Sequence, residues 1–140
     1  MLRPIVMPLA FSIFLALFAT VAVGMPAQTG KNLTSKKSQI ALGQREFIRC
    51  ASCHAIDGST GGKIGPQLRG VIGRRAGSVA GYAYSPAMKA SNIIWNEAKL
   101  DLWLTKPNAV VPGTSMAFAG LPKAADRKAV IAYLKNLGAK

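Results

Sequence analysis

The run Cys50-Ala51-Ser52-Cys53-His54 restricts this chain more than any other feature. It contains the only two cysteines and the only histidine among 140 residues. Two thiols three positions apart face the same side of a helical turn, so each can form a thioether with one vinyl group of a haem. The imidazole that follows can then reach the iron. The motif therefore predicts one covalently attached haem c, with the two cysteines binding the porphyrin and the histidine binding the metal.

Other uses of two cysteines and a histidine fit the sequence poorly. A structural zinc site needs four ligands, usually in two separated pairs, and this chain offers three adjacent ones. A thioredoxin-like dithiol is expected between a strand and a helix, yet no β-branched run precedes Cys50. A disulfide across a two-residue gap would be strained and would close almost no loop. Haem attachment is the interpretation that remains.

The N-terminal region is uncharged from Pro4 to Gly30 and almost wholly apolar from Ile5 to Val23. Small residues around Ala22-Val23-Gly24 suit cleavage by a signal peptidase. The apolar run is also close to the roughly 20 residues that span a bilayer, which favours retention as an anchor. We expect residues 1–24 to be either a signal peptide or an N-terminal membrane anchor. Residues 25–37 are expected to be a polar tether, and residues 38–140 a haem domain.

The exported part of the chain is strongly basic. Residues 25–140 contain 17 Lys and Arg against five Asp and Glu, a net charge of +12. Such a surface attracts anionic partners. Dispersed basic residues without a recognition motif, in an exported chain, argue against nucleic acid. Acidic protein surfaces or anionic lipid headgroups remain as the expected partners.

Hydrophobic spacing predicts an all-α domain with long loops. One helix is expected from a cap at Ser38 through Ile40, Gly43 and Phe47 into the haem motif. Further helices are expected over 86–90, from a cap at Asn96 to about 105, and from about 122 to 137. Glycines recur throughout 57–81, which indicates a loop that wraps around something. Short helices bury little among themselves, so a large apolar cofactor would complete the core.

An iron with one histidine needs a sixth ligand or an open face, and this choice separates electron transfer from gas binding or catalysis. Met88 and Met116 are the candidates outside the N-terminal region. Met88 lies in an expected helix, where methionine usually fills core space. Met116 follows Pro112-Gly113-Thr114-Ser115 on a loop stiffened by the proline. The residues themselves leave both candidates open.

Several further motifs resemble the class I c-type cytochromes, which include mitochondrial cytochrome c and its bacterial periplasmic relatives. The resemblance runs from about Gln39 to the C-terminus and has several separate motifs in the family's order. Those motifs are Cys50 to His54, Gly65-Pro66-Gln67-Leu68-Arg69-Gly70, Gly73-Arg74, Gly81-Tyr82-Ala83-Tyr84-Ser85, Trp95, Val111 to Gly120, and Ile131-Ala132-Tyr133-Leu134. The resemblance implies the cytochrome c fold, with three main helices and long loops wrapped around one haem.

The resemblance also implies roles for individual residues. His54 becomes the proximal iron ligand and Met116 the distal one. Pro66 would accept a hydrogen bond from His54 through its carbonyl. The other residues that it places at the cofactor are Arg74, Tyr84 and Trp95 near the propionates, Phe118 over the haem edge, and Trp103 and Thr114. Gly43, Phe47 and Tyr133 would form the contact between the terminal helices.

This chain departs from mitochondrial cytochrome c at two positions near the iron. Trp103 replaces a tyrosine whose hydroxyl reaches the distal methionine, and Met88 replaces a buried asparagine. We therefore expect fewer or different polar partners around the bond between sulfur and iron.

The function implied is a single-haem electron carrier, not an enzyme, in the periplasm, either soluble or tethered to the outer face of the cytoplasmic membrane. An alternative is an electron-transfer subunit of a larger periplasmic oxidoreductase. The implied partners are acidic-faced redox complexes: a quinol-cytochrome c reductase type donor, and a terminal oxidase or reaction-centre type acceptor. Lys63 and Lys123, with Arg49, would form a basic rim at the haem edge. No nucleic acid is expected, membrane association would come from the N-terminal segment, and the protein is expected to be a monomer.

Overall fold

The computed structural model describes residues 28–59 and 61–139, so the expected leader and the first residues of the tether lie outside it. Six helices follow one another along the described chain: α1 (Gln28–Glu46), α2 (Ile48–Ala51), α3 (Pro86–Ala90), α4 (Glu97–Thr105), α5 (Pro107–Val110) and α6 (Ala124–Gly138). In this part of the chain the only β pairing is an isolated bridge between Arg75 and Ile94. The expected all-α fold is confirmed. None of the described helices has both the length and the apolar composition needed to cross a bilayer.

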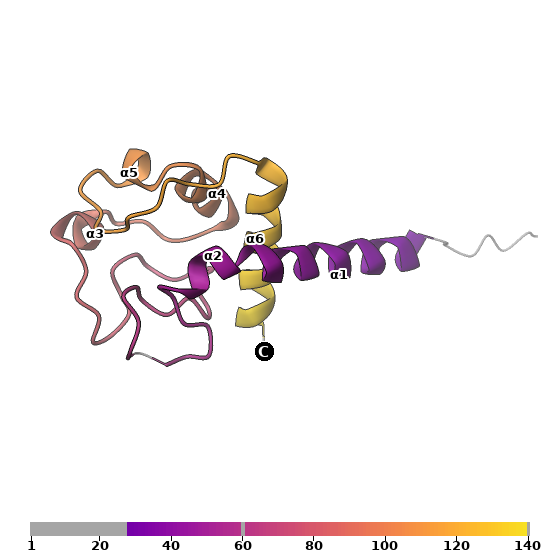
Figure 1. The fold of residues 1–140 in the computed structure, drawn as a ribbon, viewed down its shortest axis with the longest axis horizontal. Helices are drawn as coiled ribbons and strands as arrows, with labels where there is room; N and C mark the ends of the chain where they lie inside the picture. The colour runs from indigo at the N-terminus through magenta and orange to yellow at the C-terminus, as the bar shows by residue number, and fades with distance from the viewer. Residues whose placement is uncertain (1–27, 60, 140) are drawn as a thin grey trace, which may run out of the picture.

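Helix α6 crosses α1 near the C-terminal end of α1, and the rest of α1 projects well beyond the crossing (Figure 1). Gly43 makes the crossing possible, because a Cβ atom placed there would lie 2.0 Å from the carbonyl oxygen of Ala129. The rings of Phe47 and Tyr133 then pack 5.6 Å apart between centroids. The expected contact between the terminal helices is confirmed.

The expected start of the first helix is wrong. Helix α1 begins at Gln28, so residues 28–37 of the expected tether are helical. Ser38 is no cap, and its hydroxyl donates to the carbonyl of Ser35 within the helix (2.8 Å). Once the packed half of α1 has nucleated the helix, each added residue costs little, so polar residues can extend it without burial.

The remaining helix boundaries follow the expected signals closely. Asn96 caps α4 by accepting a hydrogen bond from the Lys99 amide (2.8 Å), and Ser85 caps α3 in the same way through Met88 (3.2 Å). Helix α6 starts two residues later than expected, after Lys123. Residues 57–81 form loops in their described part. Pro107 ends α4 as expected and also begins the short helix α5.

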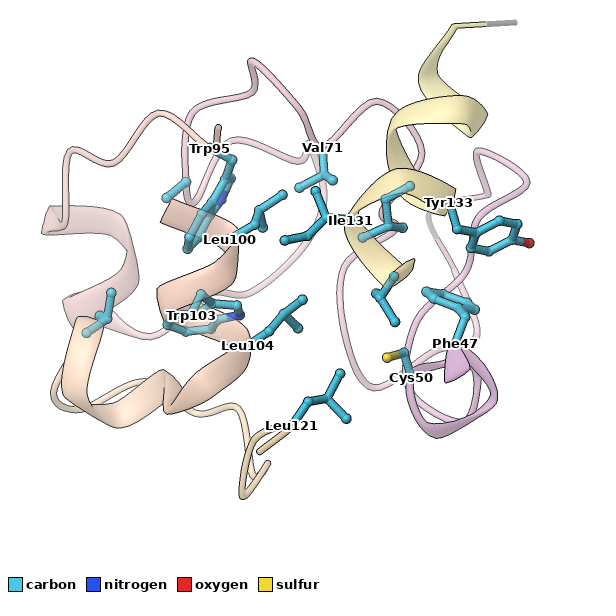
Figure 2. Close-up of a cluster of buried hydrophobic side chains, with 14 of the residues drawn as sticks. Phe47, Cys50, Val71, Trp95, Leu100, Trp103, Leu104, Leu121, Ile131 and Tyr133 are labelled. Carbon is cyan, nitrogen blue, oxygen red and sulfur yellow. The ribbon is translucent and has the colours of Figure 1, made fainter. Parts of the chain in front are cut away.

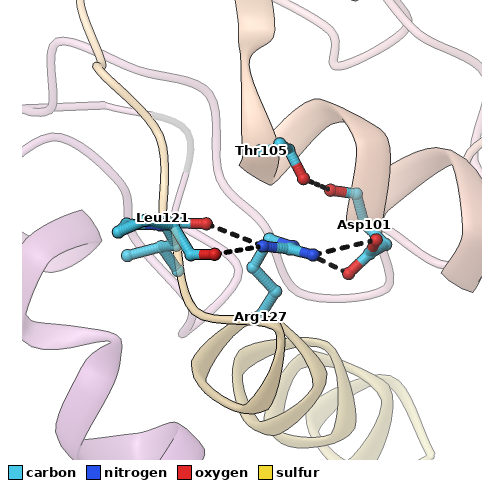
Figure 3. Close-up of polar contacts among 5 residues, drawn as sticks. Asp101, Thr105, Leu121 and Arg127 are labelled. Atoms are coloured by element: carbon cyan, nitrogen blue, oxygen red, sulfur yellow. Dashed lines mark hydrogen bonds and ion pairs between the residues drawn. The ribbon is translucent and has the colours of Figure 1, made fainter.

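Arg127 of α6 connects this helix to α4 and to the loop that precedes α6 (Figure 3). Its Nε and Nη2 atoms donate to the carboxylate of Asp101 at 2.9 and 3.4 Å. Its Nη1 atom donates to the carbonyls of Leu121 and Pro122 at 2.9 and 3.0 Å. These bonds hold the loop that leads into α6 and fix the position of α6 against α4.

Candidate haem site

The residues around the attachment motif border a cavity. A cavity of about 350 Å³ lies between α2, α3, α4, α6 and the long loops. Figure 2 shows Leu100, Trp103 and Leu104 of α4, which line this cavity. All eleven residues predicted at the cofactor line it: Cys50, Cys53, His54, Pro66, Arg74, Tyr84, Trp95, Trp103, Thr114, Met116 and Phe118. The structure thus brings together residues spread over nearly 70 positions of sequence.

The attachment motif leaves the short helix α2 in a tight turn. The amides of Cys53 and His54 both donate to the carbonyl of Cys50, at 3.0 and 2.8 Å. The two cysteines form no disulfide, and Cys50 is buried while Cys53 is partly exposed. Burial raises the pKa of the Cys50 thiol. A redox-active dithiol typically has a lowered thiol pKa, so this environment argues against that use of the two cysteines.

His54 is held in one orientation. Its Nδ1 atom lies 2.7 Å from the carbonyl oxygen of Pro66. Because a carbonyl only accepts, the neutral ring has its proton on Nδ1, and the Nε2 lone pair is free to bind a metal. Burial lowers the pKa of His54, which favours this neutral form. Gly65 packs against the ring so closely that a Cβ there would lie 2.4 Å from Cε1.

A loop between α5 and α6 brings Met116 to the same cavity. Thr114 organises the loop: its amide donates to the carbonyl of Val111 (3.1 Å), and its hydroxyl accepts from the Met116 amide (3.3 Å). Gly113 and Gly120 adopt positive φ angles in this loop. Met88 also lines the cavity, from α3, and is buried. Both candidate methionines therefore reach the space, one from a helix and one from a loop.

Cationic and hydroxyl groups gather in another part of the lining. Arg74 donates to the carbonyls of Arg69 (3.1 Å) and Gln67 (2.8 Å). Burial lowers the pKa of the Arg74 guanidinium. Burial also raises the pKa of the Tyr84 hydroxyl, which interacts electrostatically with Arg74. Groups of this kind can compensate carboxylates such as haem propionates.

Sequence reasoning missed part of the lining. Tyr82 reaches the cavity, packs edge-on against Tyr84 with centroids 4.6 Å apart, and donates to the carbonyl of Ile64 (2.7 Å). Its place in the same glycine-tyrosine motif as Tyr84 was the available signal. The apolar part of the wall comes from Leu68 and Val71 of the loops and from Leu100, Leu104, Val130 and Leu134 of α4 and α6. Helical spacing predicted that the four helical residues are apolar and face inward, but it did not predict that they border a cavity.

The donor set fits a covalently bound haem. Two free thiols, an oriented imidazole with a free nitrogen and a thioether sulfur border one apolar space. Its volume is within the range of small-molecule and cofactor sites. Such a site can hold a flat apolar macrocycle and ligate its iron from two residues.

Comparisons with known proteins agree with this geometry. The sequence model of the cytochrome c family matches residues 40–138. A cytochrome c of Gibberella zeae is 51% identical over 88 residues, covering 63% of this chain and 83% of its own. The cytochrome c-type cyt cy of Rhodobacter capsulatus is 50% identical over 96 residues, covering 68% of this chain, but this chain spans only 47% of its length. The structure of cytochrome cH from Methylobacterium extorquens superposes with a TM-score of 0.65 at 41% identity, covering 69% of this chain and 97% of its own.

The family model matches well over half of this chain, from residue 40 to residue 138. This chain also covers 83% of the fungal cytochrome c at 51% identity. The chain therefore belongs to the cytochrome c family, a family of electron carriers that bind covalently attached haem c.

Proposed function

We propose that this protein is a single-haem electron carrier that shuttles electrons between respiratory or photosynthetic complexes outside the cytoplasmic membrane, without catalysing a reaction of its own. One observation supports this most: a thioether, Met116, borders the same cavity as the oriented imidazole of His54. When bound, haem supplies a one-electron couple between ferric and ferrous iron. With one ligand from each of these two residues the iron would have no open position, which suits electron transfer.

All four residues proposed to bind the cofactor border the cavity. Cys50 and Cys53 would hold the porphyrin covalently, and His54 and Met116 would bind the iron. The Pro66 carbonyl keeps the imidazole proton on Nδ1 and so sets the basicity of the ligand nitrogen. A thioether is a soft, weak ligand, and the hydrogen bond from the Met116 amide to the Thr114 hydroxyl helps to hold its loop in place.

The remaining lining residues would match the edges of the cofactor. Arg74, Tyr84 and Trp95 would lie near the propionates, and Phe118 would cover the apolar edge. Met88 fills space as part of the wall, in agreement with its being the buried residue of the short helix α3.

We further propose that the carrier works in the periplasm, exported by residues 1–24, and docks with acidic-faced redox complexes. Lys63 supports this role, because its Nζ donates to the carbonyl of Ala51 (2.8 Å) and so lies beside the attachment motif. With Lys123, also exposed, it would form a basic rim that steers an acidic partner.

The proposed role is tested by the salt dependence of electron transfer to an acidic-faced terminal oxidase. The bimolecular rate should fall as ionic strength rises through roughly 0.1 M, where the screening length is about 10 Å. Lys63→Glu and Lys123→Glu should each slow the reaction at low salt, and the difference should vanish at high salt. Lys37→Glu, on the projecting part of α1, is the matched control and should have little effect.

A bimolecular rate that does not change with salt, and that is the same for both rim variants and the parent, would show that docking is apolar or tether-driven. A protein that exchanges no electron at an electrode would contradict the carrier function itself.

A further inference from the structure

Helix α4 separates its charges between two faces. Its two acids turn toward α6, where Glu97 pairs with Lys135 and Asp101 pairs with Arg127. Its lysine, Lys99, and the capping residue Lys106 are both exposed, and neither forms an ion pair within residues 28–59 and 61–139. The side of α4 that faces solvent is therefore positive, although the helix itself contains two carboxylates.

An apolar side chain lies between these two lysines. Leu102 follows Lys99 by three residues, a spacing that makes their side chains neighbours on the helix surface. Lys106 is the C-cap four residues after Leu102, and its amide donates to the Leu102 carbonyl (3.2 Å), so its backbone lies one turn further along α4. Leu102 is 55% exposed, one of the few large apolar side chains that the described domain leaves in solvent. We call the set Lys99, Leu102 and Lys106 the α4 face.

The α4 face lies directly outside the cavity wall. Trp103, the residue after Leu102, is only 7% exposed and lines the cavity. Its ring contacts that of Trp95, with centroids 5.3 Å apart and planes tilted by 60°. Figure 2 shows Trp103 and Leu104 turned from α4 into the interior. One peptide unit therefore separates an exposed leucine from an aromatic ring at the cofactor cavity.

We propose that the α4 face is a second docking surface, which accepts an acidic redox protein and exchanges electrons through Trp103. An apolar centre with cations around it matches a partner whose acidic rim surrounds a small apolar patch. Interfaces between redox proteins are among the smallest, so a patch of one helix face suffices for a transient encounter. In the step the partner's reduced centre gives up one electron and the ferric haem takes it, and no bond forms or breaks.

This surface uses other side chains than the basic rim around the attachment motif, although the loop before Lys123 of that rim packs against the end of α4, where the Leu121 amide donates to the Leu104 carbonyl (2.7 Å). Lys63 of that rim is fixed to Ala51, whereas the α4 face belongs to the helix that supplies Trp103. Two surfaces would let a carrier meet a donor and an acceptor without using the same side chains. The inference rests on the electron-carrier function proposed above.

The test measures reduction of the ferric holoprotein by flavodoxin hydroquinone, an acidic flavoprotein, by stopped flow. The variant Lys99→Glu with Lys106→Glu is compared with Lys36→Glu with Lys37→Glu, which makes the same charge change on exposed residues of α1. At low salt we expect the α4 pair to slow the reaction at least threefold more than the α1 pair. Leu102→Ser, which changes no charge, should slow it about twofold even at high salt.

Equal effects of the two charge pairs, or a Leu102→Ser rate equal to the parent at all salt concentrations, would overturn the proposal. So would an α4 pair that binds phosphatidylserine vesicles more weakly while its flavodoxin rate is unchanged, because the face would then recognise lipid. A parent protein that flavodoxin cannot reduce would instead contradict the electron-carrier function. In every variant the holoprotein absorption spectrum checks that the haem pocket is intact.

Discussion

Gly43→Ala tests the helix crossing that holds the two ends of the domain together. The added Cβ would lie 2.0 Å from the Ala129 carbonyl oxygen and 2.8 Å from the Cβ of Tyr133. Both atoms are fixed by the backbone of α6, so no side-chain rotation can relieve the overlap. Ordinary contact begins near 3.4 Å, so the two helices must separate by roughly 1.4 Å at this point, in a core that is otherwise close-packed.

The energetic cost can be estimated from two opposing effects. Overpacking a well-packed site costs about 1–3 kcal/mol, and contact with backbone atoms places this site at the upper end. Alanine favours a helix over glycine by about 1 kcal/mol, which offsets part of the loss. We expect Gly43→Ala to lower the free energy of unfolding by about 2 kcal/mol, taking the difference of these two contributions.

The assay is guanidinium unfolding of the ferric holoprotein, followed by circular dichroism and by haem absorption. Ala41→Gly, two residues away at an exposed position of the same helix, is the control and should cost only the propensity difference of about 1 kcal/mol. If Gly43→Ala unfolds at the same denaturant concentration as the parent or higher, the close approach of α1 and α6 is refuted.

Two further changes test the cofactor's part in folding and the hydrogen bonds of Arg127 that hold α6, here called the clamp. The double variant Cys50→Ser with Cys53→Ser should yield a haem-free chain that is largely unfolded by circular dichroism, because haem completes the core; a well-folded haem-free chain would contradict this. Arg127→Met should cost about 2 kcal/mol of unfolding free energy, since it removes bonds from a charged group to a carboxylate and two carbonyls. Lys135→Met breaks only an exposed ion pair and should cost less than about 1 kcal/mol; equal losses would show that the clamp adds nothing.

Local patterns predicted most of the helices and the chemistry of the site. The Asn96 cap and the Pro107 stop depend on neighbouring residues alone, so the sequence defined α4 almost to the residue. The haem motif lies within about one helical turn, so it too could be identified from neighbouring residues alone. The start of α1 was missed because polar residues without periodicity carry no signal for a helix that is extended from a packed segment.

Features that depend on the tertiary arrangement were harder to foresee. The residues themselves left Met88 and Met116 open, and both prove to border the cavity. Tyr82 was missed because a tyrosine in a glycine-rich loop has no preferred direction until the loop closes on its neighbours. Only the fold shows that Glu97 and Asp101 face α6 and leave the opposite side of α4 positive.

The ligation of the iron is the central claim, and the near-infrared charge-transfer band between sulfur and ferric iron tests it most directly. The parent protein should show this band. Met116→Ala should abolish it while the haem remains covalently bound, and Met88→Ala should retain it, because Met88 only contributes to the cavity wall. A band that survives in Met116→Ala and disappears in Met88→Ala would contradict the account.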